Sequence, residues 1–353
     1  MDMSLLILGF SFLLGMITSA AMHIYFGKTT YIDDNFLSST AAVWFSALIC
    51  IPLPIYFLFN DSDMVAAINY WQYITPLLSA GLIFLASLSC SIFLTSLATL
   101  IACALSVFVT DITIIFVPHW PLFLNSFFTI IALWLFALSF YCISGLNPFP
   151  QSQVILPSLG FVGLSAFGAA PLVTGISTAA LSGILFISYV RGNIQPINHA
   201  ATPLFGFIVG WLGLLSYPEY LFPCFIIFVM YHLTEAAAAG LRKLTTLDDY
   251  ATIPYNSTLY RTFEASASSP LVIRTIWHIG ALLILLGFFQ LNSPNTFSFP
   301  IFALLICLWQ HHRLLHWQKP DTTFKEDLQE SISSARKALS ALASSGKKNS
   351  GDK

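Results

Sequence analysis

Charge is the property that this sequence lacks most. Only 8% of its 353 residues are Asp, Glu, Lys or Arg, whereas soluble domains contain about 25%. Apolar residues make up 57% of the chain and its mean hydropathy is +0.79, which excludes a water-soluble globular protein. Acids (16) and bases (14) nearly cancel, so there is no basic surface of the kind that binds nucleic acid, and we expect no nucleic-acid partner.

Paired cysteines and a basic leader are also missing. No CxxC motif occurs, and each cysteine lies alone in an apolar run, which indicates small core residues: Cys50, Cys90, Cys103, Cys142, Cys224 and Cys307. The segment Met1–Ser4 lacks the basic start of a signal peptide and leads into an apolar run. We therefore expect a first helix that is retained.

Long apolar segments fill most of the chain. Proline, glycine and polar residues divide the chain into eleven such segments, at about 3–25, 38–59, 74–91, 95–117, 121–143, 154–169, 171–190, 202–217, 220–239, 270–290 and 297–315. The predicted fold is an all-α polytopic membrane helix bundle with about eleven transmembrane helices. Residues 1–318 form the integral membrane domain in this prediction, and residues 319–353 a polar cytoplasmic end.

Basic residues predict the orientation, because cytoplasmic loops accumulate Lys and Arg. If the N-terminus is outside, the inward loops hold Lys28, Arg191, Arg242, Lys243 and Arg261. The outward loops then contain neither Lys nor Arg. We therefore predict the N-terminus outside and the C-terminus inside, which suits a multi-pass protein of a bacterial cytoplasmic membrane.

A few ionisable residues fall at membrane depth, where charge is costly and a functional role is the default hypothesis: Asp111, His232, Glu235, Arg274 and His278. His232 and Glu235 lie three residues apart and share a helix face. Two interpretations stay open. Glu235 pairs structurally with a group such as Arg274, or Glu235 and His232 line a polar cleft open to the cytoplasm.

The segment Trp309–Trp317 places His312 and His316 one helical turn apart. That spacing is compatible with a metal, but flanking tryptophans and a basic residue are typical of a membrane-interface anchor. We favour the anchor and predict no metal site there.

The polar end contains one more predicted helix. Thr323–Glu326 reads as a capping box, and residues 322–343 then follow an amphipathic spacing. This helix can lie on the inner leaflet or bind a protein partner.

Several inward segments match a known pattern in order. Leu204–Gly210 is similar to FMGDxGSxFLGFxLG, Glu235–Leu244 to DxxxTLLRRL and Tyr255–Arg261 to HRSHLYQR. Weaker matches are Ser144–Pro148 to DGxDG and Ser89-Cys90 to a DD pair. Over about residues 3–290 the chain thus resembles the polyprenyl-phosphate sugar-1-phosphate transferases, of the glycosyltransferase family 4 type. These include phospho-N-acetylmuramoyl-pentapeptide transferase and undecaprenyl-phosphate N-acetylglucosaminyl-1-phosphate transferase.

The resemblance implies a cytoplasmic cleft where aspartates and Mg²⁺ join a nucleotide-activated sugar phosphate to polyprenyl phosphate, for cell-wall or surface-glycan synthesis. Polyprenyl phosphate and a UDP-sugar are the partners it implies, beside the lipid bilayer. The residues it assigns to substrate binding are Asn193, Arg242, Lys243 and Arg261.

The chain departs from the family in its acids. The family-equivalent catalytic positions hold Ser89, Cys90, Ser144, Asn147, His199, Tyr255 and Thr258, and only Glu235 retains a negative charge. Mg²⁺ needs hard oxygen ligands, usually with a carboxylate, and phosphoryl transfer depends on that ion. We therefore expect a non-catalytic relative, a pseudoenzyme, with Mg²⁺ bound only if the protein is active.

Two alternatives remain open. One is an active, rewired glycosyl-1-phosphate transferase that uses Glu235 with the loop acids Asp33 and Asp34, or Asp248 and Asp249, and with His199. The other is a membrane transporter.

Overall fold

The structure is a computed structural model that describes residues 3–29, 35–59, 71–145, 149–191, 199–217, 221–246, 253, 257–264, 269–293 and 296–315. These residues form helices and the turns between them, and no strand occurs among them. The predicted all-α class is therefore confirmed. The predicted amphipathic segment 322–343, together with the rest of the polar end, lies outside the described residues.

The helices follow one another along the whole described chain. In order they are α1 (Met3–Thr29), α2 (Asn35–Cys50), α3 (Pro52–Phe59), α4 (Trp71–Ser87), α5 (Ile92–Thr110), α6 (Leu122–Cys142), α7 (Phe149–Ala166), α8 (Leu172–Arg191), the 3₁₀ turn η2 (His199–Ala201), α9 (Thr202–Leu215), α10 (Phe222–Thr246), α11 (Thr258–Glu264), α12 (Ser269–Leu291) and α13 (Ser298–Leu315). Each predicted apolar segment contains one helix, except 38–59, which contains two.

Six helical segments are long and apolar enough to cross a membrane: Ser4–Phe26, Ile92–Thr110, Leu122–Cys142, Leu172–Val190, Phe222–Lys243 and Val272–Leu291. Three more apolar helical segments in the described part of the chain are shorter: Thr40–Tyr56, Gln72–Ser87 and His199–Leu215. Large apolar side chains are exposed on many helices, as in a protein surrounded by lipid. The chain is thus a multi-pass membrane protein, while the count of eleven passes and their orientation stay predictions.

Prolines divide the second apolar segment into α2 and α3. The last backbone hydrogen bond of α2 runs from the Ile51 amide to the Ala47 carbonyl. Pro52 has no N–H and cannot continue the ladder to Leu48, and Pro54 likewise offers no donor to Cys50. The helix therefore breaks at Ile51.

The fourth predicted span is shorter than the expected 95–117. Asp111 ends α5 in a left-handed conformation (φ 55°), and its amide donates to the Val107 carbonyl. The following irregular segment is held by Asn125, whose side-chain oxygen accepts from the amides of Phe116 and Val117. Asp111 itself is exposed at this helix end.

Helices α1 and α8 approach each other at two glycines. A Cβ atom on Gly15 would collide with the Ala180 carbonyl oxygen, and one on Gly183 would collide with the Phe12 carbonyl oxygen. Small residues are what allow helix backbones to pack this closely in membranes. This contact joins the first helix to the middle of the bundle.

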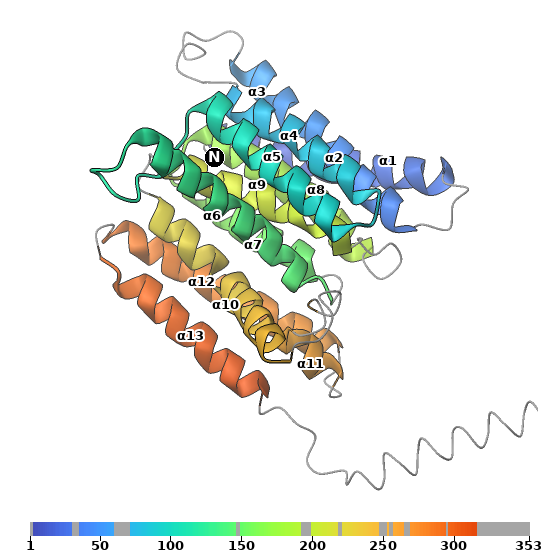
Figure 1. Ribbon diagram of the computed structural model, residues 1–353. Coiled ribbons are helices and arrows are strands. Elements are labelled where there is room, and N and C mark those ends of the chain that lie inside the picture. Colours follow the sequence, from blue (N-terminus) through green and yellow to red (C-terminus); the bar gives the residue numbers. More distant parts are fainter. Residues whose placement is uncertain are drawn as a thin grey trace, which may run out of the picture.

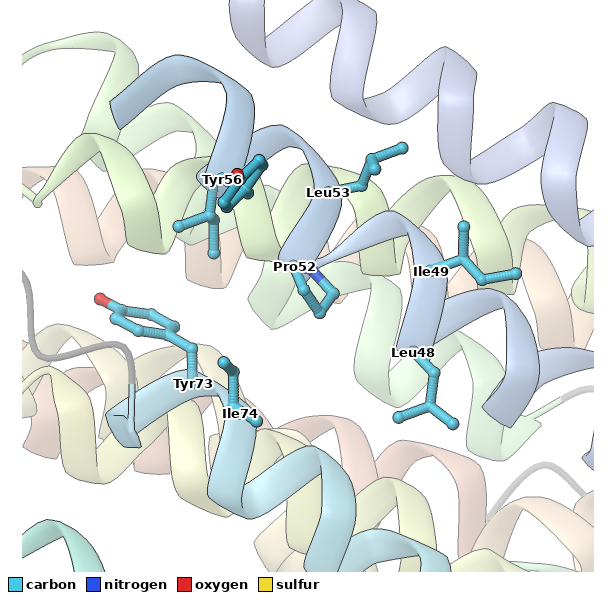
Figure 2. A pocket seen from close by; sticks show the side chains of 8 residues that line it. Leu48, Ile49, Pro52, Leu53, Tyr56, Tyr73 and Ile74 are labelled. Carbon is cyan, nitrogen blue, oxygen red and sulfur yellow. The ribbon is translucent and has the colours of Figure 1, made fainter. Parts of the chain in front are cut away.

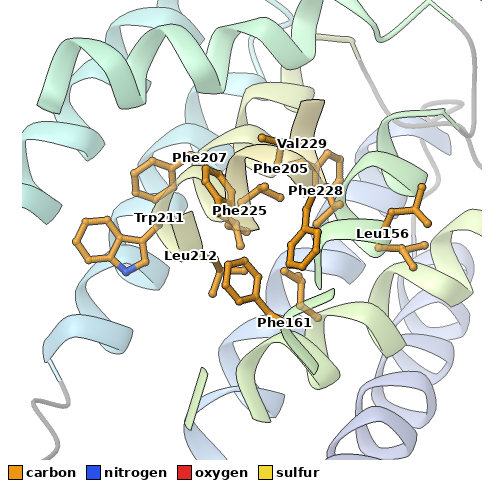
Figure 3. Packing of buried hydrophobic residues seen from close by; sticks show 14 of the residues in the cluster. Leu156, Phe161, Phe205, Phe207, Trp211, Leu212, Phe225, Phe228 and Val229 are labelled. Atoms are coloured by element: carbon orange, nitrogen blue, oxygen red, sulfur yellow. The ribbon is translucent and has the colours of Figure 1, made fainter. Parts of the chain in front are cut away.

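Helix α9 lies at the centre of the core. Its residues 202–214 are buried, and it packs against α4, α6 and α7. Figure 3 shows Phe205, Phe207, Trp211 and Leu212 of this helix beside aromatic residues of α7 and α10. The segment Leu204–Gly210, which carries the strongest motif match, is thus a buried packing helix.

The last helices form a group of their own on one side of the bundle. Helices α10, α12 and α13 pack against one another, and α10 also contacts α6 and α7. Figure 1 shows the C-terminal ends of α10 and α13 at the same end of the molecule, together with α11. The polar residues described next lie at and near this end.

Candidate functional site

A buried carboxylate and a histidine meet between α10 and α13. Glu235 has no exposed surface, and its Oε1 lies 3.3 Å from Nδ1 of His311, whose side chain is 11% exposed. The two atoms are close enough for an ion pair but are not aligned as a hydrogen bond. Glu235 therefore faces His311 of α13, whereas Arg274, the partner considered in one of the two interpretations, is exposed on α12.

Thr258 completes this contact from the start of α11. Its amide donates to Glu235 Oε2 (2.9 Å), and its hydroxyl forms a hydrogen bond with His311 Nε2. Thr258 was singled out from the sequence as the residue in place of a catalytic histidine. In the structure it bridges the carboxylate and the imidazole.

Arg242 extends the arrangement toward the end of α10. Its Nη2 donates to the Thr258 hydroxyl oxygen at 2.8 Å. Nδ1 of His311, on the opposite side of the ring from Thr258, faces Glu235. We call Arg242, Thr258, His311 and Glu235 the polar cluster.

Two neutral side chains lie near the buried carboxylate of this cluster. Tyr231 on α10 and Cys307 on α13 both interact electrostatically with Glu235. The Tyr231 hydroxyl is completely buried without a well-aligned hydrogen bond. The α10–α13 interface is thus polar over a full helical turn on each helix.

His232 lies on the neighbouring face and contacts α6. Its Nε2 is 2.6 Å from the Ser139 hydroxyl oxygen, and its ring centroid is 4.0 Å from that of Phe140. Because Ser139 donates to the Phe136 carbonyl, the serine accepts the Nε2 proton of His232. Both His232 and Glu235 are fully buried, so they do not line an open cleft.

A second pair joins two of the family-equivalent positions. Nδ1 of His199, in η2, lies 2.9 Å from the hydroxyl of Ser144, just beyond α6. These residues are far apart in the sequence, and the resemblance assigned both to the catalytic site. Ser144 is buried and also donates to the Tyr141 carbonyl.

The remaining sequence-predicted residues are more dispersed. Ser89 and Cys90 are exposed in the turn between α4 and α5, where the Ser89 hydroxyl donates to the Ala86 carbonyl. Lys243 is 6% exposed and Arg261 is exposed on α11. Asn147, Asn193 and Tyr255 lie outside the described residues, as do Asp33, Asp34, Asp248, Asp249 and His316.

The residues at the site do not fit Mg²⁺. The ion needs carboxylate oxygens that are free to coordinate, but both oxygens of Glu235 face protein groups, Thr258 and His311. Among the described residues, no group of three or more His, Cys, Asp or Glu side chains is placed to hold a metal. We therefore derive no step that passes through a metal.

His311 is the residue that the sequence argument missed. Three histidines and an arginine follow Trp309, and the segment reads as an anchor. In the structure Trp309 is 61% exposed and the Arg313 guanidinium lies 5.7 Å from its ring centroid, as an anchor requires. Only the helical phase separates buried His311 from exposed His312, since Cys307 and Leu314 mark the buried face.

No protein-family model matches the chain, and no curated protein is significantly similar to it.

Proposed function

We propose that this protein is a membrane-embedded relative of the polyprenyl-phosphate sugar-1-phosphate transferases that binds a phosphate-bearing lipid or nucleotide sugar at the cytoplasmic face without transferring the sugar phosphate. The observation that carries the proposal is the meeting of motif positions that are distant in the sequence. Ser144 contacts His199, and Glu235 contacts Thr258. A shared family site explains why these four positions pair.

The proposed topology places these residues on one side of the membrane. We count α2 and α3 as one pass and α11 as a short helix outside the membrane, which gives eleven passes with the N-terminus outside and the C-terminus inside. The ends of α6, α10 and α13, and both ends of α11, then face the cytoplasm. This arrangement agrees with the common end of α10, α11 and α13 in Figure 1.

Basic side chains at this end favour a phosphate ligand. Arg242 and Arg261 interact electrostatically with each other, and like charges held together are favoured when an anion lies between or beside them. Lys243 is the next residue on α10. Arg242, Lys243 and Arg261 are therefore the proposed phosphate-binding groups.

The state of Glu235 supports binding rather than transfer. Its two oxygens face an amide and an imidazole, and the Arg242 guanidinium interacts with it electrostatically. A carboxylate used in this way stabilises α11 and α13. It is not available to orient a metal or to accept a proton from a substrate.

The test uses the full chain in lipid nanodiscs. Undecaprenyl phosphate and a panel of UDP-sugars are added with Mg²⁺, binding is measured by native mass spectrometry, and release of UMP is followed in parallel. We expect binding of at least one ligand that weakens about tenfold in Arg242→Gln, as for loss of one charge-assisted hydrogen bond. Arg274→Gln, at an exposed arginine on α12, is the matched control and keeps full affinity.

Two results would contradict the proposal. Absence of binding to every phosphate ligand removes the carrier function altogether. UMP release that disappears in Glu235→Ala means that the protein is an active, rewired transferase.

A further inference from the structure

Most of the apolar surface of this protein selects no particular molecule. The pocket between the α2–α3 segment and the start of α4 is an example (Figure 2): its volume is about 440 Å³ and its walls are almost wholly apolar. Any hydrocarbon chain satisfies such walls, because hydrophobic contact is non-directional. A face that prefers one class of lipid must also offer charge or hydrogen bonds, and helix α12 has such a face.

Two basic side chains lie on the exposed side of α12. Arg274 and His278 are both exposed and are four residues apart, so they occupy neighbouring turns of one helix face. The face continues at spacings of three and four with exposed apolar side chains: Leu282, Leu285 and Phe289. Basic groups thus lie at one end of a stripe that is otherwise apolar.

The rotation of α12 is fixed by contacts on its other side. The Trp277 indole Nε1 donates to the Tyr189 hydroxyl of α8 at 2.9 Å. The core-facing side chains of the helix are buried: Val272, Ile276, Ile279, Leu283 and Leu286. Because a turn of the helix would expose these groups, the stripe stays on the outer side. Val272–Leu291 is also one of the segments long and apolar enough to cross a membrane, so the stripe faces lipid.

The two basic side chains have no partner in the protein. Within the described part of the chain, no hydrogen bond or ion pair reaches the side chain of Arg274 or His278. At a rise of 1.5 Å per residue, they lie about 3 Å and about 9 Å from the start of the span. A basic group beside hydrocarbon is costly unless it extends to the interface and finds an anion or water there.

We infer that this face binds an anionic phospholipid from the leaflet in which α12 begins. The phosphate accepts hydrogen bonds from the Arg274 guanidinium and the His278 ring, and one acyl chain lies along Leu282, Leu285 and Phe289. The helix rises about 16 Å from His278 to Phe289, which matches one leaflet of a hydrocarbon core about 30 Å thick. A zwitterionic headgroup adds an ammonium group that the basic side chains repel, so the anionic headgroup is preferred.

The α12 face is separate from the polar cluster. The charges that act on Arg242 are those of Glu235 and Arg261, and Arg274 is not among them. The phospholipid site therefore does not depend on the ligand proposed for the polar cluster.

Lipid retention by the full chain tests this site. The protein is purified in detergent and incubated with equal amounts of phosphatidylglycerol and phosphatidylcholine that carry the same acyl chains. Native mass spectrometry then counts the bound lipids. We expect phosphatidylglycerol to be retained about tenfold more often, as for the gain of one charge-assisted hydrogen bond. Equal retention of the two lipids would overturn the inference.

Two arginine variants locate the headgroup. Arg274→Gln should remove most of the preference for phosphatidylglycerol. Arg313→Gln, at an exposed arginine that lies over Trp309 on α13, should keep it. Equal loss in both variants would show a general attraction to surface charge, and loss in Arg242→Gln alone would place the lipid at the polar cluster. Either result overturns the inference.

Photolabelling of the unmodified protein locates the acyl chain and decides the matter even if a variant does not fold. A phosphatidylglycerol with a diazirine in one acyl chain should label peptides that contain residues 282–289 several times more than the matching phosphatidylcholine does. Equal labelling of these peptides by the two lipids would show that the headgroup does not direct binding to α12, and the site would be refuted.

Discussion

The carboxylate of Glu235 on α10 and the imidazole of His311 on α13 face each other 3.3 Å apart, and the Thr258 amide holds the second carboxylate oxygen. One residue of α11 and one of α13 thus depend on a single buried charge. The polar cluster is a structural connection between the candidate site and the last helix, whichever ligand the site binds.

Removal of His311 should destabilise the protein strongly. His311→Leu removes the hydrogen-bond partner of the buried Thr258 hydroxyl and the polar group that faces Glu235 Oε1, and leaving buried polar groups unsatisfied costs about 1–3 kcal/mol. The free energy of unfolding, measured by titration with a denaturing detergent, should fall by that amount. The exposed neighbour supplies the control, since His312→Leu should change it by less than about 0.5 kcal/mol.

Replacing Glu235 by a neutral residue in the His311→Leu variant should recover part of the lost free energy of unfolding. In His311→Leu with Glu235→Gln, no charge remains to be compensated, so the double variant should be less destabilised than the sum of the single variants by about 1 kcal/mol or more. Strict additivity in this cycle would show that the two side chains do not interact.

Ser139 should be needed to satisfy the buried His232 ring. Ser139→Ala leaves the Nε2 proton without an acceptor in a fully buried position, which costs about 1–3 kcal/mol. Thermal unfolding of the purified protein measures the loss. Ser89→Ala removes a hydroxyl whose hydrogen bonds lie within an exposed turn. It should therefore lower the unfolding temperature less than Ser139→Ala does.

The close contact of α1 with α8 should tolerate no side chain at Gly183. In Gly183→Ala the new methyl group meets the Phe12 carbonyl, and overpacking of this kind costs about 1–3 kcal/mol. Gly9→Ala makes the same change on α1 at a site with nothing within 4 Å. It should be neutral or slightly stabilising, and comparable losses in both variants would count against the contact.

Cys90 should report the orientation of the chain. It is the exposed cysteine, while Cys50, Cys103, Cys224 and Cys307 are buried and Cys142 is partly covered. A membrane-impermeant maleimide should label inside-out vesicles and spare right-side-out vesicles, because the turn between α4 and α5 is cytoplasmic in the proposed topology. Cys90→Ser should abolish the label, and reaction from the outer side would reverse the proposed orientation.

Hydropathy predicted the helices well because a segment surrounded by lipid needs apolar side chains and a backbone that is hydrogen-bonded within the helix. Each of the eleven apolar segments contains a helix, with ends that differ by several residues where polar chemistry intervenes. Asp111 ends α5 earlier than hydropathy indicates, because its left-handed conformation closes the helix. Pro52 breaks a segment that hydropathy treats as continuous.

The candidate site was less predictable because it depends on how helices face one another. The sequence identified Glu235, Thr258 and Arg242, and the structure brings these three together. It did not identify His311, since a histidine that points inward and one that points outward differ only in helical phase. The sequence also could not show that Glu235 is enclosed, because its partners come from two helices that follow much later in the chain.

That dependence has a consequence for biosynthesis. Helix α10 leaves the ribosome before α11, α12 and α13, so the Glu235 carboxylate must enter the membrane region before Thr258 or His311 exists to receive it. Until α13 is inserted, an unpaired Glu235 carboxylate is costly inside the membrane. This end of α10 therefore costs less free energy when it stays at the membrane surface. Insertion of α13 is therefore the step that encloses Glu235, and a chain truncated before α13 should remain a substrate for membrane quality-control proteases.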